Sequence, residues 1–230
     1  MSKTIVAVGA HTGDAQLTAG LLLAKHAMAG DRIVTIDLTA GERGCPPGRT
    51  PEDFRPENVA AAQAFAQGLG GESHVLDTPD GELEHTQGAA LALAGLLRRV
   101  KADAVLCHWK HSMHKDHLAA HQITADAVFF AALATFPHEL PPAPIRRVLF
   151  AENWEDAERF APYLYVDVTE AFPLWQSNIR KLWLAENSPS FQYLRYYDAL
   201  SVARGCLIRK ERAVACGAED HAKRQVLEVL

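Results

Sequence analysis

The chain has 230 residues, of which 48% are hydrophobic and 22% charged, and its formal net charge is −5. This length and composition exclude a disordered chain and fit a globular protein with a sizeable buried core. No apolar run reaches the roughly 20 residues that cross a bilayer, and the N-terminus lacks a basic stretch followed by an apolar signal core. We therefore expect a cytoplasmic protein with no membrane partner, and the negative charge argues against nucleic acid as a partner.

Strand-like and helix-like runs alternate along the chain. The strand-like runs are continuously apolar and cover residues 4–10, 32–39, 73–77, 103–109, 146–151 and 163–168. The helix-like runs cover residues 15–29, 56–69, 88–100, 117–134, 170–186 and 190–210. This alternation predicts a Rossmann-like α/β fold, in which a mostly parallel sheet is covered by helices on both faces. We expect residues 1–230 to form a single domain.

Two stretches rich in Gly or Pro interrupt this pattern. Residues 41–51 are too polar and too broken for a helix or strand, which predicts a loop at the carboxyl end of the second strand. Residues 137–144 contain several prolines and indicate a connection, not a domain linker. The last residues, 218–230, are expected to form a terminal helix packed on the body or on a second copy of the chain in a homo-oligomer.

The first polar motif of interest, His11-Thr12-Gly13-Asp14, follows the first strand-like run. If the chain turns from strand to helix here, the side chains of His11 and Asp14 point at one spot on the carboxyl edge of the sheet, where open α/β folds bind ligands. Taken alone, the motif also fits a simple structural role, with Asp14 as a helix N-cap and His11 as a polar turn residue.

A cluster of histidines follows the fourth strand-like run. Five of the eleven histidines in the chain fall between residues 108 and 121, which is far from even scattering. Two imidazoles and a carboxylate form a common catalytic set for zinc or another divalent metal, because one coordination position stays open for water. His117 and His121 are four residues apart, so on a helix either of them could reach such a metal. A pH-sensitive surface cluster is the alternative interpretation.

These motifs carry a family resemblance. The chain resembles the PIG-L/LmbE-like deacetylases, zinc-dependent enzymes that remove acetyl groups from amino-sugar derivatives and related N-acyl compounds. Ala10-His11-Thr12-Gly13-Asp14 takes the place of their Ala-His-Pro-Asp-Asp motif, and His114-Lys115-Asp116-His117 takes the place of His-Pro-Asp-His. The resemblance covers most of residues 4–125, with looser similarity around residues 166–170.

The resemblance implies a metal site and a reaction. It makes His11, Asp14 and His117 the ligands of a zinc ion, or of another divalent metal, that activates a water molecule to attack an acyl carbon, so that the C–N bond is hydrolysed. His114 would stabilise the oxyanion or protonate the leaving amine, and Asp116 would orient its ring. Asp116 also fits a plain N-cap. The expected substrate is a small polar molecule with an N-acyl group, such as an N-acetylated amino sugar.

One position departs from the family. Gly13 stands where the family has the Asp that acts as general base, and a lost base typically removes roughly 10²–10⁴-fold of the rate. Another group, such as Asp116, Glu42 or His114, could take the proton. Alternatively, Gly13 makes room for a substrate group, or the protein is a non-catalytic metal- or ligand-binding relative. If base loss is the main defect, Gly13→Asp is expected to raise amide hydrolysis at least about tenfold.

The loop after the second strand supplies two candidate substrate-binding residues. Glu42 and Arg43 belong to Gly41-Glu-Arg-Gly44, which is expected to overhang the site. A carboxylate there could bind a substrate amine or hydroxyl, although a Glu in a polar loop is usually only solvated. Aromatic residues at 109, 154, 163 and 165 could form a sugar-stacking wall, although aromatics in such strands more often belong to the core.

Overall fold

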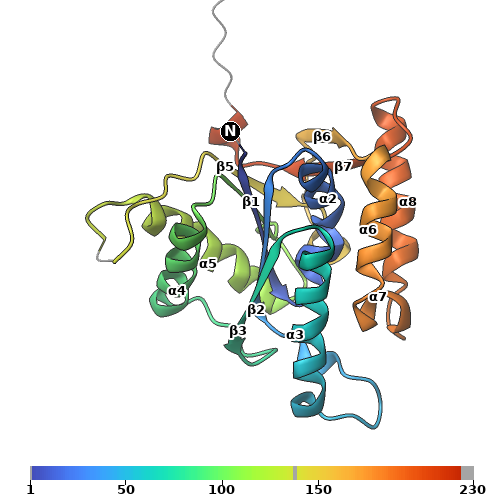
Figure 1. Ribbon diagram of the computed structural model, residues 1–230, viewed down its shortest axis with the longest axis horizontal. Helices are drawn as coiled ribbons and strands as arrows, with labels where there is room; N and C mark the ends of the chain where they lie inside the picture. Colours follow the sequence, from blue (N-terminus) through green and yellow to red (C-terminus); the bar gives the residue numbers. More distant parts are fainter. Residues whose placement is uncertain (1, 137–138, 224–230) are drawn as a thin grey trace, which may run out of the picture.

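The computed structural model describes residues 2–136 and 139–223. Seven strands in this part of the chain form one sheet in the order β3-β2-β1-β4-β5-β7-β6 (Figure 1). The strands are β1 (Thr4–His11), β2 (Arg32–Thr39), β3 (Glu72–Thr78), β4 (Ala104–Cys107), β5 (Arg147–Ala151), β6 (Leu164–Asp167) and β7 (Ala213–Gly217). The pairs formed among β1 to β5 are all parallel, so the prediction of a mostly parallel α/β sheet is confirmed.

β7 is the strand that the sequence pattern does not predict. It pairs antiparallel with both β5 and β6, and it inserts between them in the sheet. Its sequence, Ala-Val-Ala-Cys-Gly, is short and has few β-branched residues, so periodicity cannot distinguish it from a piece of buried helix. All five of its residues are nevertheless buried, because they lie between two other strands.

Helices cover both faces of the sheet (Figure 1). The α-helices are α1 (Asp14–Thr18), α2 (Gly20–Met28), α3 (Pro51–Gly68), α4 (Gln87–Val100), α5 (Lys115–Ala132), α6 (Phe172–Ile179), α7 (Trp183–Asn187) and α8 (Tyr193–Leu207). Helices α4 and α5 pack on one face, while α2, α3, α6 and α8 lie on the other. Short 3-10 turns occur at η1 (Glu42–Gly44), η2 (Trp154–Asp156), η3 (Thr169–Ala171) and η4 (Asp220–Lys223).

The continuous apolar character of the strands follows from burial on both faces. In β1, Ile5 and Ala7 belong to the hydrophobic core beneath α2 and α6. The residues between and beyond them, Val6 and Val8, belong to the core beneath α4 and α5. Alternate side chains of a strand point to opposite faces, so a strand covered on two sides needs apolar residues at every position.

Several helices differ in extent from their predicted ranges. α3 begins at Pro51, five residues before the predicted start, because Thr50 caps it by accepting a hydrogen bond from the Asp53 N–H and proline is tolerated at the first helical position. The run at 170–186 is split into η3, α6 and α7. The run at 15–29 is divided between α1 and α2 at Ala19. Of the predicted terminal helix, only η4 is described, since residues 224–230 lie outside the described part of the chain.

The strand order places the two histidine motifs side by side. The chain runs from β1 outward through β2 to β3, whereas β4 returns to the other side of β1. This is a topological switch point, and side chains that follow the carboxyl ends of β1 and β4 therefore meet in one crevice. His11 ends β1, and the segment between β4 and α5 contains His108 and His114.

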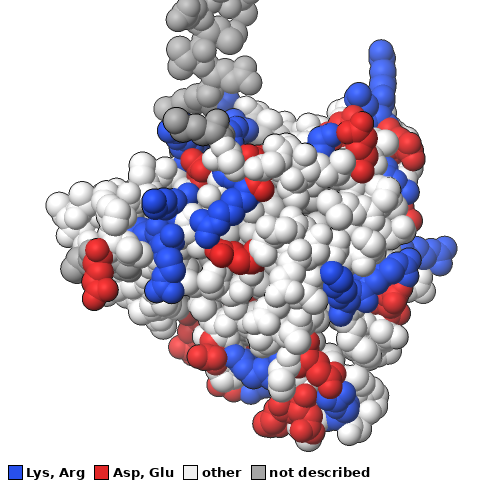
Figure 2. Space-filling view, viewed as in Figure 1, with Lys and Arg blue, Asp and Glu red and all other residues white. Residues whose placement is uncertain are grey.

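On the face shown in Figure 2, basic and acidic side chains are interspersed, so this face carries no continuous basic area. Within residues 2–136 and 139–223, no helix has the length and apolar character needed to cross a membrane.

Candidate metal centre

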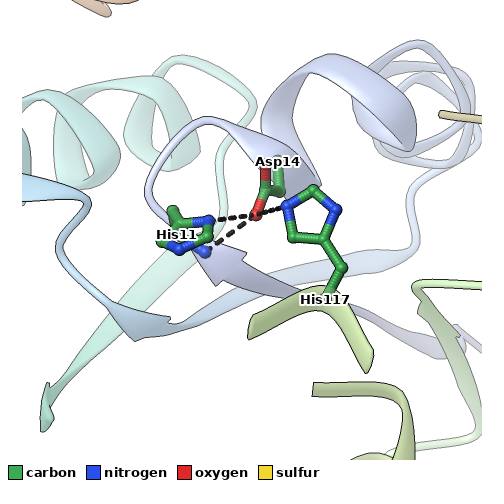
Figure 3. Close-up of side chains that lie close together, drawn as sticks. All are labelled: His11, Asp14 and His117. Carbon is green, nitrogen blue, oxygen red and sulfur yellow. Dashed lines mark hydrogen bonds and ion pairs between the residues drawn. The ribbon is translucent and has the colours of Figure 1, made fainter. Parts of the chain in front are cut away.

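Three predicted ligands, His11, Asp14 and His117, lie together at the carboxyl edge of the sheet (Figure 3). His11 is the last residue of β1, Asp14 opens α1, and His117 lies in the first turn of α5. The Asp14 Oδ2 atom is 3.2 Å from His11 Nδ1 and 3.5 Å from His117 Nε2. The same oxygen accepts a hydrogen bond from the His11 backbone N–H at 2.8 Å, which fixes the turn between strand and helix.

These separations fit a shared metal ion. With ligand distances of about 2.0–2.1 Å, two ligands of a tetrahedral zinc lie about 3.4 Å apart. The two measured separations from Asp14 lie on either side of this value, and all three ligand atoms fall within 4.8 Å of one another. His121, the alternative to His117, instead places its Nδ1 3.0 Å from the carbonyl oxygen of His108. Two imidazoles and one carboxylate therefore converge and leave a tetrahedral ion one open position.

A buried carboxylate orients the ring of His117. Asp156 Oδ1 lies 2.9 Å from His117 Nδ1, and Asp156 Oδ2 lies 2.8 Å from the Nδ1 of His108. The Nε2 of His108 accepts a hydrogen bond from the backbone N–H of Ala10 at 3.0 Å. A carboxylate on the outer nitrogen of a metal-binding histidine fixes its tautomer, so that the inner nitrogen presents a lone pair to the metal. His117 Nε2 is therefore aimed at the centre of the site.

His11 has the same support on its outer nitrogen. Its Nε2 lies 3.2 Å from Asp80 Oδ1 and 3.2 Å from Asp116 Oδ2. Burial disfavours protonation of His11, yet Asp116, Asp14 and Asp80 together raise its pKa well above the ordinary value. Burial likewise disfavours the charged form of Asp14, but the surrounding histidines, His117 and His108 foremost, hold its pKa well below the ordinary value.

The site carries an excess of acidic groups. Five carboxylates surround the histidines, namely Asp14, Asp80, Asp116, Glu155 and Asp156. Burial, followed by the charges of Asp14 and Asp156, raises the pKa of Glu155 to about 7. Imidazole nitrogens and carboxylate oxygens are the donors that bind zinc and related divalent metals, so the donor set suits such an ion.

His114 lies next to the ligand set and faces the cavity. Its ring stacks on that of His117 with a centroid distance of 4.7 Å, and it meets the ring of His11 edge-on at 4.8 Å. As the N-cap of α5, its Nδ1 accepts a hydrogen bond from the Asp116 backbone N–H at 3.2 Å. The proton of the neutral ring is therefore placed on Nε2, where it can be donated.

The Asp116 carboxylate contacts a different histidine from the one expected. It contacts His11, and its Oδ2 also accepts a hydrogen bond from the Gly81 N–H at 2.8 Å. Only the backbone of Asp116 reaches the ring of His114. The reason is the position of Asp116 in the first turn of α5, where its N–H meets the N-cap side chain. The carboxylate of Asp116 thus contacts His11, one of the predicted ligands, and does not orient His114.

A cavity of about 500 Å³ opens over these residues. Polar lining residues include the three predicted ligands, His114, Asp80, Glu155 and Arg43, and the apolar lining includes Leu17, Phe54, Trp183, Leu184 and Tyr193. The aromatic residues predicted for a sugar-stacking wall do not line this cavity. Trp109, for example, is buried against Phe150 and Phe160 in the core.

The two predicted substrate-binding residues are placed differently. Arg43 lines the cavity and pairs with Glu82 at its edge. Glu42 is buried and is not among the cavity-lining residues. Its carboxylate accepts a hydrogen bond from the Asp80 N–H at 2.9 Å and lies 3.4 Å from the Arg55 guanidinium, so in this structure it holds the loop after β3 in place.

Gly13 has a conformation that only glycine adopts readily. Its φ is +117°, and a Cβ built on it would lie 2.5 Å from the Cδ2 of Leu184. The space that a side chain at position 13 needs is therefore occupied by Leu184 of α7. The sequence shows that position 13 lacks a carboxylate, but it does not show that the side chain of Leu184 occupies the space beside it.

The structure also adds site residues that the sequence interpretation did not select. Asp80, Glu155 and Asp156 join the site, together with His108, which was noted only as part of the histidine cluster. Asp80 and the pair Glu155-Asp156 follow β3 and β5 within a few residues, as the two motifs follow β1 and β4. A search for polar residues just beyond every predicted strand end could therefore have found these site residues from the sequence.

Comparisons with known proteins identify the family of the chain. Residues 6–128, more than half of the chain, match the family described as PIG-L, GlcNAc-PI de-N-acetylase. The conserved protein TT1542 from Thermus thermophilus is similar with 26% identity and a TM-score of 0.80, covering 100% of this chain and 98% of that one.

Two further solved structures share the fold at lower identity. The 4-carboxy-2-hydroxymuconate hydratase GalB from Pseudomonas putida KT2440 is 21% identical, with a TM-score of 0.87 over 99% of each chain. The N,N'-diacetylchitobiose deacetylase from Pyrococcus horikoshii is 17% identical, with a TM-score of 0.78 over 94% of this chain and 83% of that one. The family match over residues 6–128, together with the histidine and aspartate motifs, shows that the chain belongs to the PIG-L family.

Proposed function

We propose that the protein is a zinc-dependent hydrolase of an N-acyl bond, in the first instance an N-acetyl bond, in a small polar amino-sugar-like or related molecule. The observation that carries the proposal is the convergence of His11, Asp14 and His117 at the floor of an open cavity, with ligand spacings that suit a tetrahedral ion. Family membership supports the same reaction type. The proposal includes a single-domain, cytoplasmic enzyme.

The residues around the ligands have separate tasks in this reaction. A divalent metal held by the three ligands would acidify a water molecule and polarise the acyl carbonyl. Asp156 keeps His117 in the tautomer that presents Nε2, and Asp80 and Asp116 do the same for His11. His114 presents its Nε2 proton to the cavity, where it can stabilise the developing oxyanion or protonate the leaving amine.

The other residues that line the cavity would contact the substrate. Arg43 contributes a cationic group to the lining, and Trp183 and Tyr193 supply aromatic surfaces that suit a sugar ring or another flat group. A small substrate with polar groups near the ligands and one less polar face fits this lining.

Two other functions remain as alternatives. The first is a non-catalytic metal- or ligand-binding relative, which the loss of a carboxylate at Gly13 favours. The second is a hydratase, in which the activated water adds to a carbon–carbon double bond. The loss of a carboxylate at Gly13 also favours a hydratase, because hydration needs a different proton transfer. GalB, which has a similar fold, is a hydratase of 4-carboxy-2-hydroxymuconate.

The first test combines metal analysis with a substrate screen. Untagged protein is analysed by plasma mass spectrometry beside His117→Ala, with His85→Ala as a control because His85 pairs with Asp126 on the surface. The proposal expects about one zinc per chain, lost only in the His117 variant, and acetate release from N-acetylglucosamine compounds. Bound metal with no acetate release would favour the binding relative, and turnover of a carboxylated diene would favour the hydratase.

A further inference from the structure

The acidic groups of the site differ in what their carboxylates already contact. Asp14 belongs to the ligand set, and Asp156 is engaged by two histidines. Asp116 is engaged by His11, Gly81 and the ammonium of Lys115. Each of these carboxylates is therefore already held by neighbouring groups of the site.

Two carboxylates remain that face the cavity. Asp80 is held between His11 Nε2 and the backbone N–H of Arg43. Glu155 differs, because among residues 2–136 and 139–223 no hydrogen-bond donor contacts its carboxylate. Its nearest ion-pair partner is His117, whose Nε2 lies 3.9 Å from Glu155 Oε2.

That distance places Glu155 beside the ligand set but outside it. The Nε2 atom of His117 is 3.5 Å from Asp14 Oδ2, close to the spacing of two ligands on one ion, whereas Glu155 lies farther away. Glu155 also lies outside the set of His11, Asp14 and His117, whose ligand atoms are all within 4.8 Å of one another. A water molecule near the ligands can bridge this gap, because a hydrogen bond spans about 2.5–3.0 Å between oxygens.

The backbone around Glu155 is rigidly attached to the histidine segment. Its carbonyl oxygen accepts hydrogen bonds from the Met113 N–H at 3.1 Å and the Ser112 hydroxyl at 3.3 Å. Asn153 caps the turn by accepting a hydrogen bond from the Glu155 N–H at 3.2 Å. These bonds place the carboxylate directly beside the segment that carries His114 and His117.

Position 13 supplies no comparable group. Gly13 has no side chain, and the methyl groups of Leu184 fill the space beside it. Leu184 and Glu155 both line the cavity, so the space beside position 13 is apolar and Glu155 offers a carboxylate to a water molecule near the ligands.

We propose that Glu155 is the catalytic residue that binds the attacking water and takes up its proton, and this inference rests on the proposed hydrolase function. One proton of the water moves to Glu155 Oε2 as the water oxygen forms a bond to the acyl carbon. The C–N bond then breaks, and the proton held on Glu155 passes to the leaving nitrogen. The products are the acid and the amine, and Glu155 returns to its initial state.

The test uses zinc-loaded full-length protein and three variants. Glu155→Ala removes the carboxylate, and Glu155→Gln keeps its shape. Glu158→Gln is the matched control, since Glu158 is an exposed residue near the same turn and its carboxylate pairs with Arg159. Each is assayed for zinc content, thermal unfolding, and hydrolysis of N-acetylglucosamine and of 4-nitrophenyl acetate. The ester needs no protonation of its leaving group, so it reports the water attack alone.

We expect both Glu155 variants to keep zinc and fold, while kcat falls about 10²–10⁴-fold and KM changes little. Added sodium formate should restore part of the activity of Glu155→Ala but not of Glu155→Gln, because only the smaller side chain leaves room for formate. A structural role would not produce this rescue.

Several results would overturn the inference. Unchanged kcat in Glu155→Gln would show that another group takes the proton, and loss of zinc in both variants would make Glu155 a ligand instead. If the protein cleaves only the ester, and does so in a Glu155-dependent way, the inference stands while the N-acyl hydrolase proposal fails. Wild-type protein that contains zinc but cleaves neither compound would refute both.

Discussion

Substitution of Gly13 tests whether the backbone at this position is as constrained as the structure indicates. With φ at +117° and ψ at −36°, Gly13 lies outside the small left-handed region that other residues tolerate. A non-glycine residue forced into such a conformation costs about 1–3 kcal/mol. A new Cβ would also come within 2.5 Å of Leu184 Cδ2.

The steric part of this cost is the smaller one. Leu184 Cδ2 is a terminal methyl group of a partly buried side chain, and rotation of that side chain can relieve the overlap. The backbone strain has no such relief, because Gly13 is fixed between His11 and the start of α1. We therefore expect Gly13→Ala to lower the free energy of unfolding by about 1–3 kcal/mol. For a chain of this size, each kcal/mol lowers Tm by about 2–4 °C.

Two other glycines provide matched controls in urea unfolding experiments. Gly30 has a φ of +82° with no atom near the position of a Cβ, so Gly30→Ala isolates the cost of a positive φ. Gly44 has neither constraint, and Gly44→Ala should leave stability nearly unchanged. The expected order of destabilisation is Gly13, then Gly30, then Gly44. Equal stability of the Gly13→Ala and Gly44→Ala variants would refute the reasoning.

The same constraint changes the expectation for Gly13→Asp. The sequence alone predicts a gain in amide hydrolysis of at least about tenfold, because the substitution restores a carboxylate. The structure predicts a destabilised protein with no gain, because the new side chain must displace Leu184 and strain the turn that carries His11 and Asp14. A stable Gly13→Asp variant with tenfold higher kcat would contradict this expectation.

Three further substitutions test other parts of the structure. Asp156→Asn should weaken zinc binding about 10–100-fold in competition with a chelator, since it removes the carboxylate that orients His117, and retained affinity would count against that role. Arg98→Met should lower the free energy of unfolding in urea by about 3 kcal/mol or more, because the buried guanidinium donates to four carbonyls at and beyond the end of α5. The control Arg99→Met changes an exposed residue and should cost little, so similar losses in both variants would contradict this role of Arg98. Glu42→Ala should speed hydrogen exchange at the Asp80 amide about tenfold or more, whereas an unchanged rate would show that the loop after β3 is held by other contacts.

The sequence by itself determined the layered fold and the edge of the sheet where the site lies. Continuous apolar runs such as β1 need cover on both faces, and this requirement alone predicts helices on two sides of a parallel sheet. His11 and the histidines after β4 follow strand ends, so a parallel arrangement brings them to one edge. These features are encoded by local periodicity and by position along the chain.

The tertiary structure decided which distant residues complete the site. Asp156 and Glu155 reach it only because β5 lies next to β4 in the sheet, and Leu184 reaches Gly13 only because α7 packs over the start of α1. The same is true of β7, whose short apolar sequence becomes a strand because it fits between β5 and β6. Contacts between residues far apart in the chain depend on strand order and on the packing of whole elements, which no local pattern specifies.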